Sequence, residues 1–334
     1  MRLHRVLRAV RIASISVIAV LALVTFATAA MIFFDRPEAE LRTADGAGLG
    51  APELRAEPAA SRRFTAFDEV ELGYRVYDGA GEDLPLLVLL HAAALDGRQL
   101  DALAAALAQD GVADVVVPDL RGHGPEPGAR GDLRYIGQLE DDLGELIEHR
   151  RRDGQEVVLG GHSWGGGLVV RFAGGPNGAL IDRAVLLAPY LGPDAPTTRE
   201  DAGGLARVTP FRIMGLRLLD RFGIMHWHDL RVAQLGVPAA VHGGPMGDDA
   251  TAQYSFRLQT ALMPRGAGMK DAAQLPDFLL VAGGADGAMR PDIYEPFLSE
   301  AGPRGDFVLL DAVGHFDLPD APQTRIALAD WLAR

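Results

Sequence analysis

The sequence predicts an α/β protein with a mostly parallel central sheet and helices on both faces. Short, uniformly apolar runs typical of buried strands alternate along the chain with segments typical of helices. The expected strands are 84–90, 114–118, 157–159, 181–187, 278–282 and 307–310, with an alternating edge strand at 70–77. In such a sheet ligands bind at the carboxyl edge of the strands, so we expect the functional site there.

The expected helices lie between these strands, at 100–107, 135–149 and 168–173, and a last one closes the chain at 323–332. The segment 135–149 shows the helical pattern best, because its apolar side chains share one face. These are Ile136, Leu139, Leu143, Leu146 and Ile147.

The alternation stops between Pro189 and Leu275. A structureless loop of that length is implausible in a compact domain, and its apolar residues recur in pieces at helical spacing. We therefore expect an inserted helical cap at about 190–275, above the active edge of the sheet. The alternative is a plain helical layer of the core.

The first 34 residues predict a membrane segment. A basic start, including Arg5, Arg8 and Arg11, precedes a stretch without charge from Ile12 to Phe34. As a helix this stretch would be roughly 34 Å long, enough for a hydrocarbon core of about 30 Å. The basic start favours the cytoplasmic side, which would place the rest of the chain outside. The alternative is a signal peptide cleaved near Ala27-Thr28-Ala29, followed by secretion.

Residues 35–63 are rich in Ala, Pro, Gly and charge and show little periodicity. We expect a flexible linker there, followed by the α/β domain at 64–334.

Composition excludes several functions. The 334 residues carry a formal net charge of −13 and no cysteine. An acidic chain is a poor candidate for binding nucleic acid, and a chain without cysteine has no disulfides, thiolate metal sites or cysteine nucleophile.

Ser163 is the candidate nucleophile. It is the serine of a G-x-S-x-G motif, Gly161-His162-Ser163-Trp164-Gly165, between an expected strand and an expected helix. This context is the geometry of a nucleophile elbow, in which a sharp turn exposes the serine hydroxyl above the sheet. No other serine of the chain has a comparable setting.

The serine needs a base and an acid, which follow it in the order Ser, acid, His in this kind of fold. His315 follows the last expected strand and is the candidate base. Asp286 follows the strand 278–282 in a glycine-rich loop and is the candidate acid, with Asp194 as the alternative. The two backbone N–H groups of an oxyanion hole are expected at Trp164 and at Ala92 or Ala93, and Ala92 is our choice.

With these residues the chain resembles the α/β-hydrolase superfamily, and more narrowly its monoacylglycerol lipase and lysophospholipase branch, the serine aminopeptidase S33 type of domain. The resemblance covers roughly 64–334 and rests on 161–166, on the loop 119–124 and on the triad positions. The chain departs from the family at His91-Ala92, where the family usually has His-Gly, and at Pro125-Glu126-Pro127 after the loop.

The resemblance and the residues together predict a serine hydrolase that cleaves carboxylic esters through an acyl-enzyme, such as a monoacylglycerol lipase or lysophospholipase. The chemistry needs no metal or organic cofactor. The expected partners are a lipid ester and the membrane, and the catalytic domain would be membrane-anchored outside the cytoplasm. The alternatives are an aminopeptidase-like enzyme with the same triad and a non-enzymatic binding protein. Four arginines of the cap would meet a lipid phosphate or form a solvated helix face: Arg207, Arg212, Arg217 and Arg221.

Overall fold

A computed structural model describes residues 2–37, 42–44, 48–55, 58–81, 83–125, 128–200, 204–242, 244 and 246–334. Its centre is an eight-stranded sheet in the order β12-β11-β7-β6-β4-β5-β3-β2. The strands β4 (Leu86–Leu90), β5 (Asp114–Pro118), β6 (Val157–His162), β7 (Arg183–Leu187), β11 (Asp277–Gly283) and β12 (Gly305–Leu310) run parallel. At one edge β3 (Glu71–Tyr77) and β2 (Arg62–Thr65) are antiparallel. The predicted fold class is confirmed.

The uniformly apolar strands are explained by helices on both faces. Leu86, Val88 and Leu90 of β4 belong to one buried cluster, and Leu87 and Leu89 belong to the other. The alternation follows from the period of two along a strand, so a strand covered on both sides needs apolar residues at every position.

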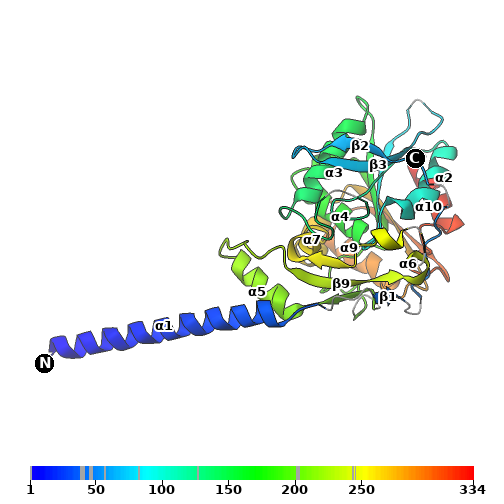
Figure 1. Ribbon diagram of the computed structural model, residues 1–334. Coiled ribbons are helices and arrows are strands. Elements are labelled where there is room, and N and C mark those ends of the chain that lie inside the picture. The colour runs from blue at the N-terminus through cyan, green and yellow to red at the C-terminus, as the bar shows by residue number, and fades with distance from the viewer. Residues whose placement is uncertain are drawn as a thin grey trace.

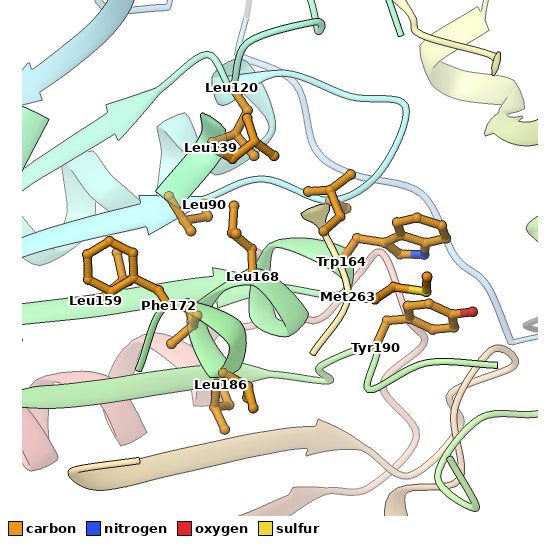
Figure 2. Packing of buried hydrophobic residues seen from close by; sticks show 14 of the residues in the cluster. Leu90, Leu120, Leu139, Leu159, Trp164, Leu168, Phe172, Leu186, Tyr190 and Met263 are labelled. Atoms are coloured by element: carbon orange, nitrogen blue, oxygen red, sulfur yellow. The ribbon is translucent and has the colours of Figure 1, made fainter. Parts of the chain in front are cut away.

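Three helices cover the first face: α3 (Gln138–Arg150), α4 (Trp164–Ala173) and α9 (Tyr294–Ala301). The opposite face is covered by α2 (Asp101–Gln109) and α10 (Pro322–Leu332). Figure 2 shows α4 in this packing, with Leu168 and Phe172 near Leu90, Leu159 and Leu186 of the sheet. This contact fixes α4, and therefore the turn that leads into it.

The insertion between β7 and β11 contains the expected helices but is not only helical. Its helices are α5 (Pro210–Asp220), α6 (Ala239–His242), α7 (Phe256–Ala261) and α8 (Met269–Ala272). Its strands β8 (Ala206–Val208), β9 (Arg231–Pro238) and β10 (Gln253–Ser255) form a second sheet. β1 (Arg42–Ala44), from the expected linker, completes this sheet by pairing in parallel with β9.

Helix α1 (Arg2–Phe34) extends away from the domain, and its C-terminal end lies against α5 (Figure 1). Ile32 is buried there, and the approach is close because α5 has Gly215 at the contact. The two helices also hold each other by polar contacts. The Asp35 carboxylate accepts the Phe211 and Arg212 N–H groups at the start of α5, and Arg212 Nε donates to the Ile32 carbonyl at 2.7 Å.

The expected flexible linker makes ordered contacts in its described parts. Besides β1, the segment 48–55 packs against the α/β domain, and Leu49 is buried in its main core cluster. The prediction of a free tether is therefore wrong for these residues. It rested on composition, and composition does not reveal hydrogen bonds between backbone groups.

Candidate active site

Ser163 occupies a sharp turn between β6 and α4. Its backbone has φ 55° and ψ −115°, a conformation that is costly for a residue with a side chain and characteristic of functional turns. The turn is tight enough to require glycine on both sides. A Cβ on Gly161 would collide with the backbone of Gly165, and a Cβ on Gly165 would collide with the carbonyl oxygens of Leu90 and His91.

The structure brings Ser163, His315 and Asp286 together in one hydrogen-bonded chain. Ser163 Oγ lies 2.9 Å from His315 Nε2, and His315 Nδ1 lies 2.7 Å from Asp286 Oδ2. Asp286 comes from the loop after β11 and His315 from the loop after β12, both at the carboxyl edge of the sheet. All three side chains are buried.

The acid is held in its ionised form. Burial raises the pKa of Asp286, but the facing His315 and two backbone N–H groups outweigh burial and leave the pKa below its usual range. These N–H groups belong to Ala288 and Met289 and bind Asp286 Oδ1 at 2.7 and 2.8 Å. An ionised Asp286 accepts the proton of His315 Nδ1, so Nε2 is free to accept the hydroxyl proton of Ser163.

The two expected oxyanion donors differ in their availability. The Ala92 N–H donates to Gln99 Oε1 at 2.8 Å and is already occupied. Among the described residues, neither the Ala93 N–H nor the Trp164 N–H has a hydrogen-bond partner. The geometry therefore favours Ala93 over Ala92, and Trp164 stays a candidate.

Gln99 was not anticipated from the sequence. Its Nε2 donates to His162 Nδ1 at 2.7 Å, and His162 Nε2 donates to the carbonyl oxygen of His315 at 3.0 Å. Gln99 and His162 are fully buried. Burial lowers the pKa of His162 well below its usual range, and the nearby His315 lowers it further. His162 is thus a neutral link between Gln99 and the candidate base.

Two other histidines before the nucleophile, His91 and His123, have structural hydrogen bonds. His91 Nδ1 donates to the Ala92 carbonyl, and His91 Nε2 accepts the Leu120 N–H. His123 accepts a hydrogen bond from the hydroxyl of Tyr254, which in turn accepts the Ala94 N–H. Burial lowers the pKa of His123 to about 3, so this contact stays neutral. Through it the cap strand β10 holds the loop that follows β4.

The remaining candidates lie apart from the triad. Asp194, the alternative acid, is exposed, and His315 instead meets Asp286. The four cap arginines do not share one face, because Arg207 lies on β8 and Arg212 is buried against the end of α1. Arg217 and Arg221 line the wall of a cavity of about 640 Å³ between α1, α5 and α7.

That cavity is largely apolar. Its lining includes Met31 from α1, Met214 and Leu218 from α5, and Phe256 and Met263. Figure 2 places Met263 in the packed group that contains Tyr190 and Trp164, the residue after Ser163. Within the described residues, no group of three or more His, Asp or Glu side chains is arranged to hold a metal ion.

Comparison with known proteins identifies the family and the fold of this chain. The profile of the family described as serine aminopeptidase, S33, matches residues 82–315. No curated protein matches the sequence.

Solved structures with the same fold include a monoglyceride lipase from Saccharomyces cerevisiae, with TM-score 0.65, 18% identity and coverage of 85% of this chain and 98% of that one. A monoacylglycerol lipase from Paleococcus ferrophilus has TM-score 0.57 and 20% identity, over 78% of this chain and 98% of that one. A putative aryl esterase from Burkholderia cenocepacia has TM-score 0.58 and 19% identity, over 82% and 98%. The family match and the fold together show that this chain is a member of the serine aminopeptidase S33 family, with an α/β-hydrolase fold.

Proposed function

We propose that the protein is a serine hydrolase that cleaves carboxylic esters through an acyl-enzyme. The observation that carries the proposal is the continuous hydrogen-bonded chain from Asp286 through His315 to Ser163. Ser163 Oγ attacks the ester carbonyl while His315 Nε2 takes its proton. His315 then gives the proton to the leaving alcohol. Water, deprotonated by the same nitrogen, cleaves the acyl-enzyme and regenerates Ser163.

The negative charge that develops on the carbonyl oxygen needs donors already in place. The N–H groups of Trp164 and Ala93 fulfil this role in the proposed mechanism. Trp164 begins α4, where the helix dipole also favours a negative charge. The ring of Trp164 is stacked on Tyr190 with centroids 4.7 Å apart, which keeps the start of the helix in place.

The proposed substrate is a lipid ester, such as a monoacylglycerol or lysophospholipid. The apolar cavity beside α5 has the volume of a ligand site and a lining suited to an acyl chain. It lies against α1, whose residues Val10–Phe34 are long and apolar enough to cross a membrane. An ester whose acyl chain already resides in a bilayer fits both features.

We also propose that α1 is retained as a membrane anchor, with the catalytic domain outside the cytoplasm. The basic start of the chain supports this orientation. The burial of Thr28 against α5 supports retention over cleavage near Ala29, because cleavage there would remove this contact. Secretion after cleavage is the alternative.

A peptidase is the second candidate function, because the matched family is described as serine aminopeptidase and the same triad cleaves amides. A panel of substrates separates the two. Monoacylglycerols and lysophospholipids of graded chain length are compared with aminoacyl amides of matched size. Ester cleavage that improves with chain length supports the lipase proposal, and faster cleavage of the amides would overturn it.

The nucleophile is tested with a fluorophosphonate probe on the full chain in detergent. Wild type and Ser299→Ala, a control at an exposed serine, should be labelled, and Ser163→Ala should not. Labelling that persists in Ser163→Ala would refute the assignment.

A further inference from the structure

The segment that follows β1 contacts both loops that carry the candidate acid and base. The carbonyl oxygen of Gly48 accepts the N–H of Gly287 at 2.9 Å and the N–H of His315 at 3.0 Å. The next carbonyl, of Leu49, accepts the N–H of Phe316 at 2.7 Å. One short piece of chain therefore bridges the residue after Asp286 and the backbone of His315.

Two carboxylates from the loop between β12 and α10 also bind this segment. Asp317 Oδ1 accepts the Ala51 N–H at 3.0 Å, and Asp320 Oδ2 accepts the Glu53 N–H at 2.7 Å. These carboxylates follow His315 by two and five residues, so the segment is fastened to the loop that it supports. We call residues 48–53 the clasp.

The clasp requires glycine at Gly48. Its φ is +76°, in the left-handed region, and a Cβ there would collide with the carbonyl oxygen of Ala285 and the N–H of Gly287. The close approach is what allows one carbonyl oxygen to reach both loops. The glycine content of 35–63 suggested a flexible linker, but at Gly48 the glycine is explained by close packing against the two loops.

The two loops are also joined directly, by the Asp286–His315 hydrogen bond and by the Gly284 N–H, which donates to the Leu310 carbonyl at 2.7 Å. Ala285 N–H donates to the Val313 carbonyl at 3.1 Å, ahead of His315. Beyond that point the clasp supplies the partner of the His315 N–H. A buried N–H without a partner is costly, so loss of the clasp would favour movement of the loop until water reached it.

We propose that the clasp is a positioning element of the active site, which holds the Asp286 and His315 loops in register so that His315 Nε2 stays aligned with Ser163 Oγ. The inference rests on the proposed serine hydrolase function for its kinetic consequence. The clasp contacts no reacting atom; it acts through the backbone of the two loops.

The first test compares Gly48→Ala with Gly111→Ala in the full chain in detergent. Both glycines have left-handed φ, +76° and +68°, but a Cβ on Gly111 has no neighbour closer than 3.8 Å. The control therefore has the backbone strain without the collision. We expect the kcat for ester cleavage and the rate of fluorophosphonate labelling to fall on the order of tenfold to a hundredfold in Gly48→Ala only, with KM little changed.

A second pair of variants covers the case in which Gly48→Ala does not fold. Asp317→Ala removes the acceptor of the Ala51 N–H, and Asp317→Asn keeps an oxygen there. We expect a lower kcat in Asp317→Ala and recovery toward the wild-type value in Asp317→Asn. A kcat equal to wild type in both Gly48→Ala and Asp317→Ala would overturn the proposal, as would a loss in Gly111→Ala as large as in Gly48→Ala.

Amide hydrogen exchange distinguishes this inference from the proposed function. The peptides that contain Gly287 and His315 should exchange faster in Gly48→Ala than in wild type, whether or not the protein cleaves esters. Unchanged exchange there would refute the clasp and leave the serine hydrolase proposal intact. If exchange at Gly287 and His315 is faster in Gly48→Ala as expected, but the probe does not label Ser163 in wild type, the proposed function is refuted and the clasp is not.

Discussion

Gln99→Leu should destabilise the protein and slow its reaction, although the hydrogen bonds of Gln99 go to Ala92 and His162 and not to Ser163. The substitution keeps the approximate volume of the side chain but removes its donor and acceptor. The Ala92 N–H and His162 Nδ1 then lose their partners in a region where Gln99 and His162 are fully buried. Each orphaned buried group costs about 1–3 kcal/mol, which gives a loss of about 2–6 kcal/mol in the free energy of unfolding.

The assay is urea denaturation of the full chain in detergent, followed by fluorescence. Gln323→Leu is the control, because Gln323 is exposed on α10 and a surface change is expected to stay within about 0.5 kcal/mol of wild type. The kcat should also fall in Gln99→Leu, since His162 holds the carbonyl of His315 and would lose its fixed orientation. A cost no greater than that of Gln323→Leu, with unchanged kcat, would refute this account of Gln99.

Three further predictions concern separate parts of the molecule. Gly165→Ala should abolish fluorophosphonate labelling, because its Cβ would collide with the carbonyl oxygens at the end of β4; Gly154→Ala, where a Cβ meets nothing within 4 Å, should keep it. Asp320→Asn should remove a pH dependence of stability. Burial raises the pKa of Asp320 to about 6. The contribution of this group to the free energy of unfolding of wild type is therefore lost as pH rises from about 4 through about 6. The variant should be more stable than wild type at pH 8, on the order of 2 kcal/mol, and similar at pH 4; equal melting curves at pH 8 would contradict this. Asp35→Ala removes the acceptor at the start of α5 and should lower stability by about 1 kcal/mol, whereas Asp35→Asn should recover most of it; identical unfolding midpoints for all three proteins would show that the contact is not stabilising.

The parallel strands and the candidate triad residues could be predicted from the sequence. Each strand is marked by its own apolar run, and the triad residues follow strands in a fixed order along the chain. A strand buried on both faces must be apolar throughout, as β4 and β5 are. Ser163 has a motif with a strand before it and a helix after it, and His315 and Asp286 follow later strands in the expected order. Short elements with mixed patterns were missed, such as the four-residue edge strand β2 and the cap strands.

Gln99 and the clasp could not be predicted, because their partners are distant in sequence. Gln99 is 63 residues from His162, and the Ala51 N–H is 266 residues from its acceptor on Asp317. Hydrogen bonds between residues so far apart leave no periodic pattern in the sequence. Ala92 was chosen for the oxyanion hole because a loop position does not reveal which of two neighbouring N–H groups is already engaged, and Gln99 engages that of Ala92.

The joint between α1 and α5 determines how the enzyme would face its surroundings. A domain on a flexible linker could turn any side toward a bilayer. Here the hydrogen bonds of Asp35 and Arg212 join the end of α1 to the start of α5, and the pairing of β1 with β9 adds a second attachment. With α1 across a bilayer as proposed, the cavity that includes Met31 opens beside the point where the helix emerges. The enzyme would then meet its substrate by lateral diffusion in the membrane plane, in a fixed orientation relative to the bilayer. Its turnover would therefore depend on the surface density of the lipid and not on its bulk concentration.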